Sequence, residues 1–221
     1  MASTHTRVPA EGRRLQIIEV ATALFARQGF NGTTTRQIAQ RAGVNEAIIF
    51  RHFPTKEDLY WAVIESQCSV RGTRATLEAR LVDDSDPAEA LTAVAEDFLR
   101  RDTTLTRLLL FTALEKHELS DRFYRTHVAR YFELLADYVR RNIDKGAFRV
   151  VDPLLAARSF IGMLFHHFHV QELYGGKKYQ QFDVTDVART LVDVWLRGVQ
   201  APGPDRVSAR GDLVETSHRN D

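Results

Sequence analysis

Apolar residues recur at steps of three and four along almost the whole chain, a spacing that places them on one face of an α-helix. Strict alternation of apolar and polar residues, which would indicate β-strands, is absent from the sequence, and only six prolines interrupt the 221 residues. Glycines, Asn-Gly and Asp-Pro stand between the periodic stretches, where they end one helix or start the next. The sequence therefore predicts an all-α fold.

Composition narrows the class of protein. Hydrophobic residues make up 44% and charged residues 27%, as in ordinary globular proteins. The single cysteine, Cys68, excludes a disulfide framework within one chain and favours a reducing, cytoplasmic compartment. No run of 18 apolar residues and no apolar N-terminal segment is present, so we expect neither a membrane span nor a signal peptide.

Positive charge gathers near the N-terminus. Residues 1–56 contain eight Lys or Arg and three acidic residues, whereas the remainder contains 22 basic and 26 acidic residues. A basic end on a mildly acidic body suits a polyanion such as nucleic acid.

After the first periodic stretch, signals for helix ends follow one another closely. Gly29 ends the first helix, and Thr33–Thr35 offer N-cap hydroxyls to a second. Gly43 breaks the second helix, and Asn45 is a cap for a third. The predicted helices span about 35–42 and 46–52, a fourth starts near residue 56, and longer helices cover about 104–116, 120–145, 152–173 and 184–199.

Residues 35–53, TRQIAQRAGVNEAIIFRHF, have the layout of a helix-turn-helix. Gly43 supplies the tight turn, while Val44 and Ile49 are placed to pack the second helix across the first. Such a pair inserts its second helix into the major groove of DNA. The alternative is a plain helical hairpin buried in a core.

The first 65 residues resemble the N-terminal domain of the tetracycline-repressor (TetR) family of bacterial regulators. About 50 residues carry the resemblance, RRLQIIEVATALFARQGFNGTTTRQIAQRAGVNEAIIFRHFPTKEDLYWAV. The matching features are Ala21 with Phe25, Gly29-Phe30, Thr35, Ile38-Ala39, Ala42-Gly43-Val44, His52-Phe53, and Lys56 with Leu59. The remaining residues resemble the family only in that they form a divergent helical domain of the right length.

The resemblance implies a three-helix DNA-binding domain over residues 1–56 and a larger helical domain for ligand binding and dimerisation over 57–200. We expect the polar, Pro- and Gly-rich segment 201–221 to be a disordered tail. The implied DNA-contacting residues are Thr35, Arg36, Asn45, Glu46, Ala47, Ile48, Phe50, Arg51, His52 and Lys56.

Three of these residues depart from the family pattern. Phe50 replaces the usual tyrosine and lacks a hydroxyl for a phosphate. Glu46 brings an acid toward the phosphates, although it can accept a hydrogen bond from cytosine N4. Ile48 replaces a commoner hydroxyl residue and can contact a thymine methyl. DNA affinity and base preference are therefore less constrained than the fold.

The helical body supplies candidates for an apolar cavity and for a dimer interface. The two last helices are apolar over more than one face, which suits burial against both a core and a second copy, although a fully buried core helix is the alternative. Candidate ligand-binding residues are Trp61, Phe98, Leu105, Leu109, Phe123, His127, Tyr131, Phe160, Leu164 and His167, each of which can instead simply fill the core. Candidate dimer residues are Phe165, Leu191, Val194 and Trp195.

Other chemistry finds little support in the sequence. Among the histidines of FHHFHV, only His166 and His169 share a helix face, and no carboxylate stands at a helical spacing to complete a metal site. We expect no metal and no cofactor. Cys68 is more simply an inert small residue than a redox sensor.

Three functions remain in competition. The leading hypothesis is a homodimeric repressor that binds a palindromic operator in double-stranded DNA and is released by a small, largely apolar ligand. The second is a His-dependent hydrolase on a helical scaffold, for which the sequence shows no nucleophile motif, so we expect no enzyme activity. The third is a helical interaction protein without operator binding, supported only by Glu46 and Phe50.

Overall fold

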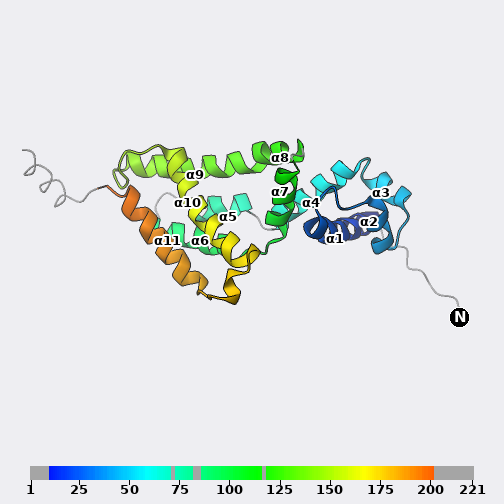
Figure 1. Ribbon diagram of the computed structural model, residues 1–221. Coiled ribbons are helices and arrows are strands. Elements are labelled where there is room, and N and C mark those ends of the chain that lie inside the picture. The colour runs from blue at the N-terminus through cyan, green and yellow to red at the C-terminus, as the bar shows by residue number, and fades with distance from the viewer. Residues whose placement is uncertain (1–9, 71–72, 82–85, 116–117, 202–221) are drawn as a thin grey trace, which may run out of the picture. The chain divides into compact units, whose positions relative to one another are not determined.

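The computed structural model describes residues 10–70, 73–81, 86–115 and 118–201 (Figure 1). Within these ranges the regular structure is helical, and the one β-bridge joins Phe148 to Gln200. The predicted all-α fold is confirmed. Of the predicted tail, only Ala201 lies inside the described residues.

The chain forms two compact units. Unit 1 comprises Met1–Thr76 and Asp102–Ala129, and unit 2 comprises Leu77–Arg101 and Arg130–Asp221. The helices are α1 (Ala10–Gln28), α2 (Thr35–Ala42), α3 (Glu46–His52), α4 (Lys56–Val70), α5 (Thr73–Arg80), α6 (Pro87–Leu99), α7 (Thr104–Leu114), α8 (Glu118–Phe123), η1 (Tyr124–Val128), α9 (Ala129–Asp144), α10 (Pro153–Phe168), η2 (His169–Leu173), η3 (Gly176–Lys178) and α11 (Val184–Val199).

The predicted bounds of α2, α3 and α11 are confirmed. The helix that the sequence placed from Ser120 already includes Glu118 and Leu119 where the described residues resume. It also contains a five-residue π-helical turn, η1, before it continues as α9. Periodicity does not reveal such a turn, since one inserted residue shifts the apolar stripe only locally.

Unit 1 has a single apolar core that α7 and α8 share with α1–α4. Phe25 and Tyr60 meet edge to face, with ring centroids 4.7 Å apart, and Leu108 of α7 lies in the same fully buried cluster. The Tyr60 hydroxyl donates a 2.7 Å hydrogen bond to the Leu108 carbonyl oxygen. Two residues from the N-terminal helices and one from α7 are thus joined in one core.

Unit 2 is built around Trp195 of α11. Its indole N–H donates to the Ala156 carbonyl oxygen at 3.1 Å and to Ser159 Oγ at 3.0 Å. The rings of Phe148 and Phe160 lie 5.8 and 5.4 Å from it. These contacts fix α11 against α10, whose N-terminus is capped by Asp152, as the sequence predicts.

Candidate nucleic-acid interface

The N-terminus of α2 is held by a capping box. Thr34 Oγ1 accepts from the Gln37 N–H at 3.2 Å, and Gln37 Oε1 accepts from the Thr34 N–H at 2.9 Å. Of the three candidate threonines, Thr34 is therefore the cap, while Thr33 is buried and donates to the Gly29 carbonyl oxygen. Arg36, the second residue of the helix, is left exposed.

The turn between α2 and α3 depends on Gly43. Its φ of 65° lies in the left-handed region, which other residues adopt only with strain. The Val44 N–H closes the turn on the Ala39 carbonyl oxygen at 3.0 Å. Gln16 Nε2 of α1 donates to the Ala42 carbonyl oxygen at 3.2 Å, so the turn is also tied to the supporting helix.

Helix α3 buries one side and exposes the other. Asn45 Oδ1 caps it by accepting from the Ile48 N–H at 2.9 Å, and Ile49 is only 1% exposed. On the outer side, Ala47, Phe50 and Arg51 are exposed, whereas Glu46, Ile48 and His52 are half-buried. This is the arrangement that a recognition helix requires, with an apolar anchor inside and a variable face outside.

Glu46 is engaged by the neighbouring helix. Thr35 Oγ1 donates a 2.6 Å hydrogen bond to Glu46 Oε1, which joins the first residue of α2 to the first residue of α3. The hydroxyl is therefore not a free donor for phosphate in this structure, and one oxygen of the acid already has a donor. The sequence alone does not predict this bond, since eleven positions separate the two residues.

Lys56 begins α4 beside an aromatic ring. Its Nζ lies 4.2 Å from the centroid of the Phe30 ring, a cation–π contact. Burial lowers the pKa of Lys56, and the carboxylates of Glu57 and Glu115 oppose that change. The sequence predicts that Lys56 contacts a phosphate. In such a contact, the Lys56 ammonium would either leave the Phe30 ring or remain over it with the phosphate beside it.

His52 and Arg14 complete this side of unit 1. His52 Nε2 is buried and has no hydrogen-bond partner among the described residues, so this nitrogen does not face a ligand in the present rotamer. The Arg14 guanidinium lies 5.1 Å from the Phe53 ring centroid. The sequence prediction that His52 flanks a DNA backbone stays a prediction.

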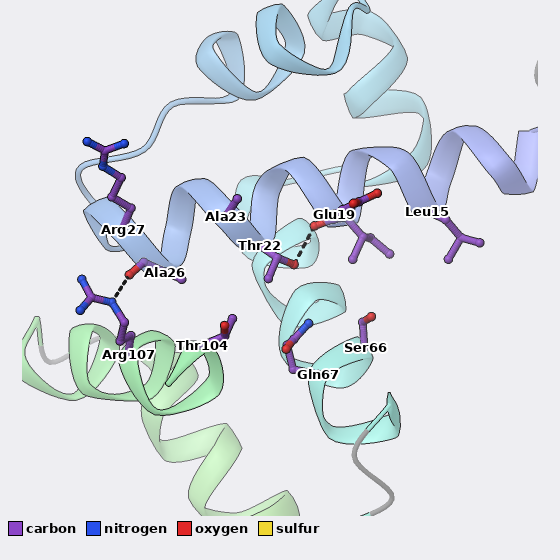
Figure 2. Close-up of a pocket in the computed structure, with 11 residues that line it drawn as sticks. Leu15, Glu19, Thr22, Ala23, Ala26, Arg27, Ser66, Gln67, Thr104 and Arg107 are labelled. Carbon is purple, nitrogen blue, oxygen red and sulfur yellow. Dashed lines mark hydrogen bonds between the residues drawn. The ribbon is translucent and has the colours of Figure 1, made fainter. Parts of the chain in front are cut away.

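Helix α7 is hydrogen-bonded to the C-terminal end of α1. Arg107 Nε donates a 2.7 Å hydrogen bond to the Ala26 carbonyl oxygen (Figure 2). A groove of about 690 Å³ lies beside this bond, with Leu15 and Thr22 of α1 on one wall and Gln67 on the opposite wall in Figure 2. No local pattern predicts the bond, because 81 positions separate its partners.

A second link from α7 reaches the turn after α1. The Asn31 N–H donates to Glu115 Oε2 at 3.3 Å. A Cβ on Gly29 would lie 2.9 Å from Glu115 Oε1 and 3.0 Å from the Phe111 ring. Gly29 thus permits both the left-handed φ of 76° that ends α1 and the close approach of α7.

The structure brings together three of the predicted ligand residues in unit 1. The His127 ring stacks on Phe123 at 5.0 Å and lies 5.9 Å from Trp61, and His127 Nε2 is 3.3 Å from Glu65 Oε1. The Arg122 guanidinium covers Trp61 at 3.9 Å. Leu105 and Leu109 are half-buried on α7.

The other five ligand candidates belong to unit 2. Phe160 and Leu164 are fully buried in its core, and Phe98 packs edge to face on Phe168 at 6.2 Å. Burial raises the pKa of Tyr131, which nearby Arg101 partly opposes. His167 stands apart from these, on the wall of a separate hollow.

The four dimer candidates differ in exposure. Val194 is 56% exposed and Phe165 is 39% exposed, so both are available to a second copy. Leu191 is half-buried against its own core, and Trp195 is 5% exposed and serves that core, as described above. Among the four candidates, Val194 and Phe165 therefore contribute to the outward apolar surface of α10 and α11, whereas Trp195 does not.

We predict that two histidines of unit 2 make stability depend on pH. Burial lowers the pKa of His167 and His169 below the usual 6.5, and neighbouring His166 adds to both shifts. On acidification the unfolded chain therefore takes up these protons before the folded chain does. We expect the free energy of unfolding to fall as pH drops through 6.5, and to level off below the folded-state pKa values.

Urea unfolding at a series of pH values tests this expectation. A double variant, His167→Gln with His169→Gln, should show a shallower loss between neutral pH and pH 5 than the wild type does. Equal slopes for the two proteins would contradict the assignment of the pH dependence to these residues.

The described residues contain neither of two other kinds of site. No group of three or more His, Cys, Asp or Glu side chains that could hold a metal ion occurs in those ranges. No helix there is both long and apolar enough to cross a membrane.

Comparison with known proteins gives matches to both parts of the chain. A model of bacterial regulatory proteins of the tetR family matches residues 17–63. A model of the C-terminal domain of AefR-like transcriptional repressors matches residues 89–198.

The relatives of this chain include transcriptional repressors. An HTH-type repressor of Mycobacterium tuberculosis is 33% identical over 180 residues, which cover 79% of this chain and 87% of that protein. The repressor AcnR of Corynebacterium glutamicum is 28% identical over 152 residues, covering 67% of this chain and 75% of AcnR. The structure of AibR in complex with isovaleryl coenzyme A and operator DNA has a TM-score of 0.64 at 22% identity, covering 82% of this chain and 97% of that one.

Proposed function

The chain belongs to the TetR family of bacterial regulatory proteins, and from this premise we propose that it represses transcription as a homodimer that a small ligand releases from its operator. The observation that carries the proposal is the helix-turn-helix of unit 1. Its inner residues Ile38 and Ile49 are buried, and Arg36 and Arg51 are exposed. The exposed side thus offers positive charge beside a helix that can enter a groove.

The exposed residues suggest how bases are distinguished. Ala47 and Ile48 at the start of α3 offer apolar contact to a thymine methyl group. Glu46 has a carboxylate oxygen beyond the one that Thr35 engages, and it can accept from an amino group such as cytosine N4. Arg36 and Lys56 supply charge for phosphates, which fix position without reading sequence.

Two copies are needed because one short helix reads few base pairs. In the proposed dimer, α10 and α11 of each protomer pack on their counterparts through Val194 and Phe165, which are among the exposed apolar residues of those helices. The two recognition helices would then be about 34–36 Å apart and meet successive major grooves of a palindromic operator. The protein would act in the cytoplasm, where the bacterial chromosome lies.

DNA titration tests the proposal directly. Labelled duplexes from the regions flanking its own gene should bind in the fluorescence anisotropy assay, and the logarithm of affinity should fall linearly with the logarithm of salt concentration. A shuffled duplex of the same composition serves as the control and should bind at least about 1,000-fold more weakly. Equal affinity for all duplexes would exclude specific operator recognition.

Ligand response is proposed from the family and from the structural likeness to AibR, which was solved with an acyl coenzyme A and operator DNA. A largely apolar ligand that favours one arrangement of the helical body should lower operator affinity by about 5- to 150-fold. Compounds that raise the melting temperature should be retested in the DNA titration. If compounds that bind tightly leave operator affinity unchanged, the release mechanism is wrong even though the family assignment stands.

A further inference from the structure

Unit 2 contains a hollow of about 350 Å³ that takes no part in the DNA contacts or the dimer interface proposed above. We name it the π-turn cavity; it lies at the C-terminal end of α10, beside η2 and the start of α11. Leu99, Phe168 and Val187 form its apolar part and are each at most 9% exposed. Its volume lies within the range of small-molecule sites, which are largely apolar with a few polar groups.

The backbone beside the cavity departs from regular helix. In η2 the Tyr174 N–H donates to the His169 carbonyl oxygen at 3.0 Å, five residues back, which defines a π-helical turn. The wider turn carries Gln171 and Glu172 on the cavity wall. Such turns cost stability relative to α-helix and occur frequently at functional sites.

Three polar side chains on the wall are within reach of a ligand. His167 and Gln171 are half-buried and Gln181 is exposed, so their polar atoms are accessible from the cavity. The amides each offer donors and an acceptor, and a neutral imidazole offers one of each. Burial and neighbouring His166 lower the pKa of His167, which favours the neutral imidazole at pH 7.

The charges on the wall cancel one another. Lys177 Nζ is 2.5 Å from Glu172 Oε2, so each charge has its counter-ion. A charged ligand would lose its hydration on binding. Because the wall offers no unpaired opposite charge to compensate, its binding is unfavourable. An uncharged ligand meets no such cost and can hydrogen-bond to the glutamine amides on the wall. The Phe182 ring, 5.7 Å from His167, adds an aromatic face at the rim.

We propose that the π-turn cavity binds a small uncharged molecule with an apolar part against Leu99, Phe168 and Val187 and an amide or hydroxyl head against His167 and Gln171. The proposal deepens the ligand response of the proposed function by assigning a place and a chemistry. Its test uses the full-length protein without DNA, so its failure is distinguishable from a failure of operator binding.

Three probes with the same six-carbon chain separate charge from shape: hexanamide, hexanoate and hexylamine. We expect hexanamide to titrate the protein saturably, with a dissociation constant near or below about 1 mM, and both ions to bind at least about tenfold more weakly. Calorimetry gives the affinities. The imidazole NMR signal of His167, identified by its loss in His167→Gln, reports whether the probe occupies this cavity.

Two matched substitutions test the polar head. Gln171→Leu should weaken hexanamide binding by about tenfold, because the ligand amide loses its partner. Gln180→Leu makes the same chemical change at an exposed glutamine outside the cavity wall and should leave binding unchanged.

A third substitution tests the charge argument. Lys177→Met removes the partner of Glu172 and should raise the affinity for hexylamine relative to hexanamide. The proposal is overturned if hexanamide does not shift the His167 signal saturably, if hexanoate or hexylamine binds the wild type as tightly, or if Gln171→Leu and Gln180→Leu behave alike.

Discussion

Replacing Val194 with glutamate should convert the proposed dimer into monomers and lower operator affinity by about 100-fold or more. Val194 is 56% exposed within one protomer, so the substitution does not disturb the core of unit 2. In the dimer, the new glutamate would place an unpaired carboxylate in the buried interface. The free energy cost of burying that charge would exceed the free energy that holds the two protomers together. A monomer with one recognition helix retains little beyond non-specific attraction to the phosphates.

Sedimentation velocity at micromolar concentration measures the first effect and anisotropy titration the second. Val150→Glu is the control, because it makes the same change at a valine that is 86% exposed and precedes α10. That variant should remain dimeric. A wild-type monomer, or a dimeric Val194→Glu protein with full operator affinity, would refute the proposed interface.

Arg36→Ala should weaken operator binding by about tenfold and lower the magnitude of the salt slope by about one ion. Arg36 is exposed on the first turn of α2, where its charge and the helix dipole both favour a phosphate. The fold should be unaffected, since the Thr34 capping box that starts the helix does not involve this side chain.

Arg125→Ala is the matched control for this variant. Arg125 belongs to the same unit and is exposed, but its guanidinium is paired with Asp121 at 2.7 Å and lies outside the helix-turn-helix. Its removal should leave both affinity and salt slope nearly unchanged. Equal losses in the two variants would mean that overall charge, rather than a contact made by Arg36, governs binding.

The N-terminal fold was largely predictable because its signals are local. Gly43 and Asn45 act on residues within five positions, so the turn and the cap can be identified from spacing alone. The faces of α3 follow equally from periodicity, which placed Ile49 inside. The residues inferred to contact DNA remain predictions, although Arg36, Ala47 and Arg51 are exposed as such contacts require.

Other features depend on partners that lie far apart in the chain. The hydrogen bond from Thr35 to Glu46 requires knowledge of how α2 crosses α3. The position of Lys56 over Phe30 requires the turn after α1 to fold back on α4. The π-helical turn at η2 leaves no mark in the apolar periodicity, because the inserted residue changes the direction of side chains over only one turn.

The core that α7 shares with the N-terminal helices limits how this protein can be re-engineered. A chimeric regulator that takes only residues 1–56 would omit Tyr60 and Leu108, whose 2.7 Å hydrogen bond lies in that core. It would also omit Arg107, whose side chain hydrogen-bonds to the Ala26 carbonyl oxygen near the end of α1. A transplant that keeps the native surroundings of the recognition helix must carry residues 57–76 and 102–129 as well, so the portable module is discontinuous in the gene although it is compact in space.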